Sequence, residues 1–497
     1  MNKRRFFVPV IVLLIAVCMR LPHLNGSFWL DEAAQALESS RPLADQYKIQ
    51  DDFQPPLFHY LTHFMIISGT FFIHLPPPLN LPLGQGERIV EWWLRSTSLF
   101  AGLASVALLF LILQKKGNQR TAIVGSLLFA TSSFHIFYSQ ELRPYALACF
   151  FACLSWIGLL GGQKAKVKGA KWSDVIFVVA TIGGMYSMYL YPLITLSQIL
   201  YVWFEQKPRF VRTFFLSLFS FLFFLPWLPF FLGQLKAGTT LTQTLPGWAA
   251  AVATPQLKAL PLVFLKFFIG QVEIQGSLAL GLLAGIPVFV FLLMCLYIWK
   301  QKKYRMWVYW FFVPIIAAWM VSFIVPVIQP KRVMIALPAM WGIIAIVTEQ
   351  LGEKKKRIIA GICLLVFFIT NIGTSVLYYT VPAYQREDWR TLISRLEKQE
   401  SGSIALFAFP SPYAPWVWYN NGSIRALASG SIRLNTIEDA NVYKIATASS
   451  QIIVFDYLRD LTDPNHSTEK WLRTKGYHQS QVLDGKQIGF VRIFSKE

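Results

Sequence analysis

An acidic pair, Asp31 and Glu32, follows closely after the first apolar run of the chain, within Phe-Trp-Leu-Asp-Glu at 28–32. A carboxylate beside apolar neighbours near a membrane surface loses part of its hydration. Partial desolvation raises the pKa of such a group toward the range in which it acts as a general base. Acidic pairs are also common in solvated loops, so the pair alone supports either interpretation.

Two further runs carry cations. Glu141, Arg143 and Tyr145 lie within Glu-Leu-Arg-Pro-Tyr, and Lys331 and Arg332 end the run Pro-Val-Ile-Gln-Pro-Lys-Arg. Arginine and lysine both bind phosphate well, which predicts a site for an anionic group. The alternative for each run is a local ion pair, or a side chain that extends to lipid head groups.

Several other chemistries lack their motifs. The sequence has no GxxxxGK[ST] loop, no dinucleotide glycine fingerprint, no HExxH and no GxSxG. Its five cysteines all fall in apolar runs and show no metal-ligand spacing. The apolar runs contain almost no charged residues, which argues against a coupled transporter.

The composition is that of a membrane protein. Of 497 residues, 55% are hydrophobic and only 14% are charged. The formal net charge of +20 sits mainly in short runs between apolar segments. This pattern is typical of cytoplasmic loops facing anionic lipid, and we therefore expect no nucleic-acid partner.

Apolar runs of the length needed to cross a bilayer predict about eleven helical spans. They cover residues 6–22, 94–113, 121–139, 144–162, 174–188, 190–204, 211–231, 277–299, 306–325, 333–350 and 358–379.

Basic residues predict the sidedness. Every second connection between these spans is basic, from Lys3-Arg4-Arg5 at the start to Lys354–Arg357 before the last span. Such connections face the cytoplasm. An odd number of spans then places the C-terminal residues outside the cytoplasmic membrane.

The outer connections differ in kind. Residues 23–93 form a long first loop with an apolar segment at 57–73, which contains His59 and follows Gln54 and two prolines. A full crossing here would reverse every later basic loop, so we expect an interfacial helix. A second long outer loop, 232–276, predicts another interfacial helix near 256–270.

The chain divides into two predicted domains. Residues 1–379 form the membrane domain, and residues 380–497 have the composition of a small soluble α/β domain. Within the latter we expect strands at 404–409, 451–455 and 488–494, and a helix at 468–475.

This placement constrains the chemistry. Nucleotide-activated sugars are confined to the cytoplasm, whereas a polyprenyl-phosphate sugar is already delivered to the outer face. One carboxylate base and one cationic site for the leaving phosphate suffice for such a transfer. A single displacement of this kind inverts the anomeric centre.

The ordered motifs resemble the membrane glycosyltransferases of the GT-C superfamily, family-39 type, which includes protein O-mannosyltransferases and lipid A aminoarabinose transferases. In chain order, the matching motifs are Trp-Leu-Asp-Glu at 29–32, Gln-Pro-Pro-Leu at 54–57, Arg-Ser at 95–96, Glu-Leu-Arg-Pro-Tyr at 141–145, Pro-Trp-Leu-Pro at 226–229, Lys-Arg at 331–332 ahead of Pro338, and Glu-Asp-Trp-Arg at 387–390.

The resemblance implies a GT-C fold, in which Asp31 is the catalytic base, Glu32 orients it or the acceptor, and a polyprenyl-phosphate sugar is the donor. We expect the donor phosphate to be held by Arg143, Lys331 and Arg332. The expected supporting residues are Gln54, His59, Arg95, Glu141 and Tyr145.

Two positions depart from the family. Gln54 stands where the motif has histidine, which puts a metal or acid role there in doubt, and Val333 replaces an aromatic residue. No metal ligand is assigned, and whether a divalent cation takes part stays open. The sugar is not identified, and the acceptor can be a lipid, a glycan or a protein. Alternative functions are an outer-face polysaccharide polymerase or ligase, and a transporter or binder of lipid-linked glycans.

Overall fold

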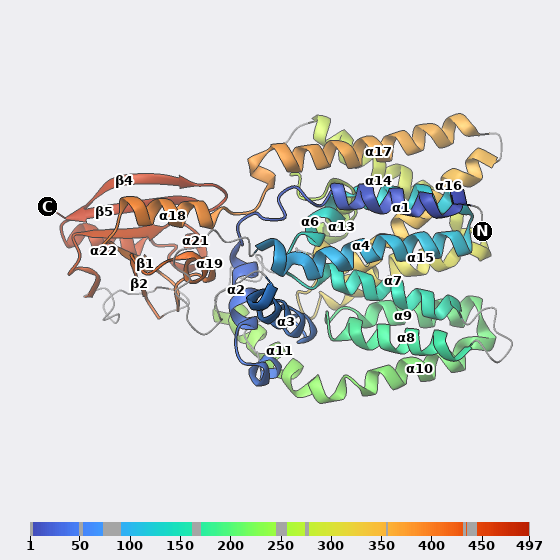
Figure 1. Cartoon of the computed structure of the whole chain (residues 1–497), viewed down its shortest axis with the longest axis horizontal. Helices are drawn as coiled ribbons and strands as arrows, with labels where there is room; N and C mark the ends of the chain where they lie inside the picture. Colours follow the sequence, from blue (N-terminus) through green and yellow to red (C-terminus); the bar gives the residue numbers. More distant parts are fainter. Residues whose placement is uncertain are drawn as a thin grey trace.

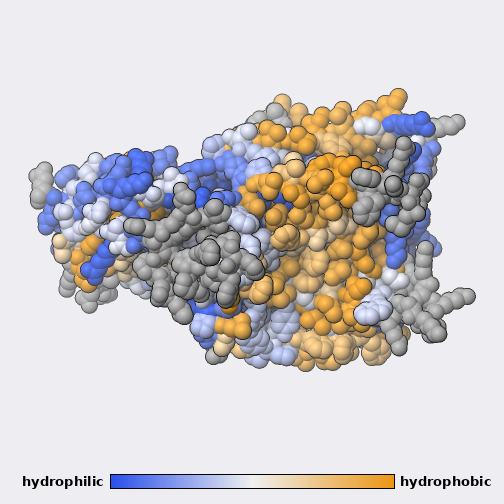
Figure 2. All heavy atoms as spheres, in the orientation of Figure 1, coloured by the Kyte–Doolittle hydropathy of each residue, from blue (hydrophilic) through white to orange (hydrophobic). Residues whose placement is uncertain are grey.

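The protein consists of a helical bundle with a small sheet domain at one end. The N-terminus lies at the opposite end of the bundle from the sheet domain (Figure 1). On the face that Figure 2 shows, hydrophobic side chains cover much of the bundle and hydrophilic ones cover much of the sheet domain. The computed structural model describes residues 3–48, 53–72, 91–161, 170–244, 256–273, 278–353, 356–430, 434 and 445–496.

Long apolar helices make up the bundle, and many of their side chains face outward. Leu296 is 67% exposed and Ile358 is 80% exposed, as suits contact with lipid. These helices are α1 (Lys3–Cys18), α4 (Glu91–Lys116), α5 (Gln119–Thr131), α6 (Ser133–Ser139), α7 (Tyr145–Gly161), α8 (Ala170–Met185), α9 (Pro192–Glu205), α10 (Phe210–Leu222), α13 (Gln256–Ile269), α14 (Leu278–Trp299), α15 (Arg305–Val321), α16 (Leu337–Glu353) and α17 (Arg357–Thr380).

Within the described residues, six helical segments are long and apolar enough to cross a membrane, or seven when α5 and α6 are counted as one broken span. Shorter apolar helices include α1, α7 and α8. The prediction of a multi-pass helical protein is thus confirmed, whereas the count of about eleven spans stays a prediction.

Two predicted spans are interrupted. The run at 121–139 is not one straight helix, because α5 and α6 meet at Ser132 with a bend of 62°. The run at 211–231 is divided by a short 3₁₀ turn, η3 (Leu225–Trp227), after which α11 (Leu228–Thr244) begins. The division of 174–204 is present, and Pro192 opens α9 in the first-turn position that proline favours.

Shorter elements lie at the end of the bundle that faces the sheet domain (Figure 1). They include α2 (Leu30–Ser39), η1 (Leu43–Lys48) and α3 (Leu57–Phe72), and α3 packs on both α2 and α4. The predicted interfacial helix at 57–73 corresponds to α3. The other one, near 256–270, corresponds to α13, but α13 is packed among α6, α14 and α17 with Val263 and Phe268 fully buried.

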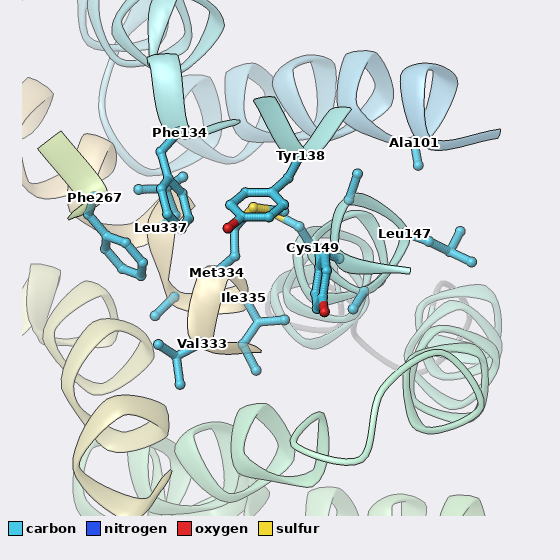
Figure 3. Packing of buried hydrophobic residues seen from close by; sticks show 14 of the residues in the cluster. Ala101, Phe134, Tyr138, Leu147, Cys149, Phe267, Val333, Met334, Ile335 and Leu337 are labelled. Atoms are coloured by element: carbon cyan, nitrogen blue, oxygen red, sulfur yellow. The ribbon is translucent and has the colours of Figure 1, made fainter. Parts of the chain in front are cut away.

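The bundle core surrounds a 3₁₀ segment, η5 (Pro330–Ala336), which leads into α16. The second half of η5, residues 333–336, is fully buried. Figure 3 shows these side chains packed among residues of α6, α7 and α13, such as Tyr138, Cys149 and Phe267. This packing anchors η5, so the two residues at its start, Lys331 and Arg332, are held at a defined place.

The sheet domain has a five-stranded sheet in the order β2-β1-β3-β5-β4. Strand β1 is parallel to β2 and β3, and β5 is antiparallel to β3 and β4. The elements are η6 (Pro382–Tyr384), α18 (Trp389–Gln399), β1 (Ile404–Phe407), α19 (Ala414–Tyr419), β2 (Arg425–Ala428), β3 (Gln451–Phe455), α21 (Arg459–Thr462), α22 (Ser467–Thr474), β4 (Tyr477–Gly485) and β5 (Gly489–Lys496).

Candidate functional site

Helix α2 carries the acidic pair at its first turn, at the end of the bundle nearest the sheet domain. Adjacent helical positions point about 100° apart, so the two carboxylates face different surroundings. The side chain of Asp31 is 35% exposed, whereas that of Glu32 is fully buried. The two residues therefore cannot share one role.

Glu32 forms a buried ion pair with Arg95 of α4. The Arg95 guanidinium donates from Nε to Oε1 at 2.8 Å and from Nη2 to Oε2 at 2.5 Å. The amide of Leu142 also donates to Oε1 at 2.7 Å, and Arg386 Nε lies 3.8 Å from Oε2. Burial alone would raise the pKa of Glu32, but Arg95 and Arg386 outweigh it and hold the pKa below its ordinary value.

Arg95 also ties down the loop that precedes α2. Its two Nη atoms donate to the main-chain oxygens of Leu24, Gly26 and Ser27 at 2.7–3.1 Å. The same guanidinium thus connects α4, the loop and α2. Arg95 and Glu32 position the first turn of α2, and neither has a free surface to offer a substrate.

Asp31 faces a different group, the start of η5. Lys331 Nζ lies 3.8 Å from Asp31 Oδ2, a long ion pair in which both side chains are partly exposed. The Lys331 ammonium also lies 5.5 Å from the ring centres of Trp29 and Tyr145, within the range of cation–π attraction. A carboxylate and a cation therefore share one partly open position beside two aromatic rings.

Two more predicted cations lie close to this position. Arg332 is electrostatically coupled to Arg143, Tyr145 and Asp31. Arg332 Nη1 donates to the main-chain oxygen of Val327 at 3.1 Å. The three positive charges repel one another, so an anion bound among them would be strongly favoured.

Glu141 lies beneath the same cations, in the turn between α6 and α7. It is buried, and its Oε2 atom has no hydrogen-bond partner within the part of the chain that the structure describes. Burial raises the pKa of Glu141 to about 7, although Arg386 and Lys331 act in the opposite direction. Near neutral pH this carboxyl group can therefore exchange a proton.

Gln54 and His59 contact Gln35, one turn after Asp31 on α2. The Gln54 amide bonds with Gln35 and lies 2.9 Å from His59 Nε2, and the Gln35 amide lies 2.9 Å from His59 Nδ1. These contacts fasten α3 to the later turns of α2. Gln54 and His59 thus support α2 one turn or more after Asp31.

The sheet domain contributes contacts that the sequence did not indicate. Arg386 reaches Glu32, and Glu387 and Tyr457 are electrostatic neighbours of Asp31. The motif at 387–390 marked the first of these segments but did not assign it to the site. No sequence motif marked Tyr457, because its position near Asp31 depends on how the two domains pack together.

A metal centre is not apparent among the described residues. No group of three or more His, Cys, Asp or Glu side chains lies close enough together to hold a metal ion there. The Lys331 ammonium lies 3.8 Å from Asp31, and a second positive charge at this place would be repelled. We therefore assign no metal ligands.

Comparison with known proteins identifies the fold. No family model matches the chain, and no curated protein matches it. ArnT from Cupriavidus metallidurans is similar in structure in the apo state, with a TM-score of 0.57 and 11% identity over 99% of this chain and 97% of that one. The structure of the same enzyme bound to undecaprenyl phosphate gives a TM-score of 0.57 with 10% identity, over the same shares of the two chains.

A second group of similar structures comes from Archaeoglobus fulgidus. Its oligosaccharyltransferase, in complex with zinc and sulfate, has a TM-score of 0.55 and 12% identity over 98% of this chain and 72% of that one. Both neighbours are GT-C glycosyltransferases. The resemblance to the GT-C superfamily is thereby confirmed at the level of the fold.

Proposed function

We propose that this GT-C-fold protein is an inverting glycosyltransferase, which moves a sugar from a polyprenyl-phosphate donor to an acceptor at the outer face of the cytoplasmic membrane. The observation that carries the proposal is the position of Asp31, partly exposed and 3.8 Å from Lys331, with Arg143 and Arg332 close by. A base and a phosphate-binding set are what such a transfer requires. The similarity to an ArnT structure bound to undecaprenyl phosphate supports the choice of donor.

The cations would act on the donor phosphate. Lys331, Arg143 and Arg332 would bind the phosphate group and stabilise the negative charge that grows on its oxygen as the bond to the sugar breaks. The same phosphate would draw the Lys331 ammonium away from Asp31, because it offers more negative charge than one carboxylate. Donor binding would then leave Asp31 ready to accept a proton.

Asp31 would act on the acceptor. The acceptor hydroxyl would attack the anomeric carbon from the face opposite the phosphate while Asp31 takes its proton. One carbon–oxygen bond forms and the bond from that carbon to the phosphate oxygen breaks, which releases polyprenyl phosphate. With one carboxylate at the reacting position, the anomeric configuration inverts.

The outer location rests on the distribution of basic residues. The basic end of α4, with Lys115 and Lys116, and the start of α17, with Arg357, lie at the end of the bundle away from the sheet domain (Figure 1). The positive-inside rule assigns this end to the cytoplasm. Asp31 and the sheet domain would then be outside, where a lipid-linked sugar is available and a nucleotide sugar is not.

Sugar transfer by Asp31→Asn tests the proposal. The full chain in lipid nanodiscs would be given a panel of polyprenyl-phosphate sugars and an extract of envelope glycolipids as acceptors. We expect wild-type protein to release polyprenyl phosphate and Asp31→Asn to release none, while that variant still binds undecaprenyl phosphate. Glu38→Gln, at the other end of the same helix, where Glu38 pairs with Arg41, serves as the matched control and should remain active. Full activity of Asp31→Asn would overturn the assignment of the base.

A further inference from the structure

The first turn of α2 is held from outside the bundle as well as from within. The residue before this helix, Trp29, makes no side-chain hydrogen bond to the helix start. The first amides of a helix have no partner inside it, and an uncapped start costs about 1 kcal/mol. The helix that carries Asp31 therefore depends on other elements for its cap.

Glu387, in the segment between α17 and α18, lies at this helix start. Its carboxyl group is close enough to the amide of Leu30, the first residue of α2, for that amide to lower its pKa against the effect of burial. Burial raises the pKa of Glu387 to about 7, and its ionised form interacts favourably with the dipole at the helix N-terminus. The position of Leu30, and of Asp31 directly after it, is thus linked to the sheet domain.

The Glu387 carboxylate is itself fixed at both oxygens. Tyr457 donates its hydroxyl proton to Oε1 at 2.8 Å, and the Trp389 indole donates to Oε2 at 2.6 Å. Trp389 is fully buried and packs against the Tyr457 ring, with ring centres 5.1 Å apart. Both donors belong to the sheet domain, so the position of the Glu387 carboxylate is fixed relative to that domain.

The residues just before α2 are tied to the same domain. The amide of Phe28 donates to the Tyr419 hydroxyl at 2.7 Å, and the amide of Arg390 donates to the Ser27 hydroxyl at 3.1 Å. Tyr419 in turn donates to Glu91 of α4 at 2.9 Å. The sheet domain therefore contacts the chain on both sides of Trp29.

We propose that Glu387 is a positioning residue for sugar transfer, which holds the first turn of α2 so that Asp31 stays opposite Lys331. This inference rests on the proposed function for its link to transfer, but the contact with Leu30 does not depend on it. It makes the sheet domain a working part of the catalytic site. Both Glu387 and Tyr457 lie close enough to influence Asp31 electrostatically.

Two measurements on full-length protein in nanodiscs test the proposal. Steady-state transfer by Glu387→Ala should show kcat lowered roughly 10- to 100-fold, since a misplacement of about 1 Å costs that much. The KM for the donor should change less than about twofold, because the phosphate would be held by the cations of η5 and by Arg143, in the turn before α7, rather than by Glu387. Glu387→Gln keeps one acceptor oxygen and should fall between Glu387→Ala and wild type.

Hydrogen exchange gives the second readout, which is independent of transfer. The peptide covering the start of α2 should exchange faster in Glu387→Ala than in wild type, and the peptide covering α3 should not. Tyr457→Phe removes only one donor to Glu387 and should show a smaller change in both readouts, which keeps the test open if Glu387→Ala misfolds. Glu397→Ala is the matched control, because its carboxylate accepts only from Asn421 inside the sheet domain at 2.6 Å.

The possible results separate the two claims. Unchanged kcat in a folded Glu387→Ala, or a raised donor KM at unchanged kcat, would overturn the positioning role. Equal exchange at the start of α2 in variant and wild type would overturn the cap. If wild-type protein transfers no sugar from any donor, the proposed function falls, and the exchange data still decide whether Glu387 holds α2.

Discussion

Replacement of Arg95 by lysine separates the charge of this side chain from its shape. Arg95 makes five hydrogen bonds, two to Glu32 and three to main-chain oxygens of the loop before α2. A lysine ammonium keeps the positive charge but has only three donors, and they leave from one point. At least two buried acceptors would then lack a partner.

The expected loss of stability follows from the number of hydrogen bonds that each variant loses. Each buried acceptor left without a partner costs about 1–3 kcal/mol, so the loss of two partners in Arg95→Lys should destabilise the protein by about 2–6 kcal/mol. Arg95→Met loses all five hydrogen bonds and also leaves the Glu32 charge with only a distant partner, and the loss of one member of a buried pair by itself costs about 3–5 kcal/mol. The methionine variant should therefore be the less stable of the two, although it matches the apolar surroundings better.

The free energies of unfolding of wild type and variants can be measured in mixed micelles with a rising fraction of denaturing detergent. Arg473→Lys is the matched control, since Arg473 pairs with Glu469 on the exposed surface of α22, where such a pair contributes at most about 1 kcal/mol. Destabilisation below about 1 kcal/mol for both Arg95 variants would refute the view that Arg95 organises the start of α2. A lysine variant less stable than the methionine variant would refute the reasoning about charge.

Three further predictions concern the phosphate site, the buried acid and the topology. Lys331→Met should weaken binding of undecaprenyl phosphate about 10- to 100-fold by native mass spectrometry, since a charged hydrogen bond contributes about 1.5–3 kcal/mol, while Lys303→Met should bind as wild type does; equal binding by both variants would contradict the site. Because the folded protein raises the pKa of Glu141 from 4.5 to about 7, it binds this proton more tightly than the unfolded chain does, so stability falls as pH rises through this window. Glu141→Gln should abolish this loss of stability with pH and exceed the wild type in free energy of unfolding by about 3 kcal/mol at pH 8. Parallel curves of unfolding free energy against pH for the two proteins would contradict this prediction. A membrane-impermeant maleimide should label Ser394→Cys but not Lys302→Cys on intact cells, and the reverse pattern would invert the topology.

The membrane domain was largely predictable because hydrocarbon demands long apolar helices. The bend at Ser132 was not, since the polar residues 131–133 interrupt the apolar run only briefly and no proline stands there. Tertiary contacts accompany the bend. Ser133 bonds Thr374 at 2.9 Å and Asn371 bonds the main chain of Leu128 at 2.9 Å, so α17 makes polar contacts on both sides of the break.

The strands of the sheet domain were also predicted only in part. β1 and β3 lie inside the sheet and were predicted, because buried parallel strands read as continuous apolar runs. β2 and β4 form its two edges and were missed. β4 is exposed along most of its length and has an irregular register between Gln479 and Gln481, so it shows no alternation of apolar and polar residues.

The candidate site was predictable where its residues lie in short motifs. Asp31, Arg143 and Lys331 were found from residue type and sidedness, and the structure brings them together. The different surroundings of Asp31 and Glu32 were not evident, because two neighbours of the same chemistry differ only in their burial. Glu387 and Tyr457 reach the site through the docking of one domain on another, which a single sequence does not reveal.

A density map of the full chain with bound undecaprenyl phosphate tests the central claim most directly. The account predicts phosphate density in contact with the Lys331 ammonium and the guanidinium groups of Arg143 and Arg332, with the Asp31 carboxylate next to it. Phosphate density on the basic connections at the opposite end of the bundle, or on the exposed face of α18, would contradict it.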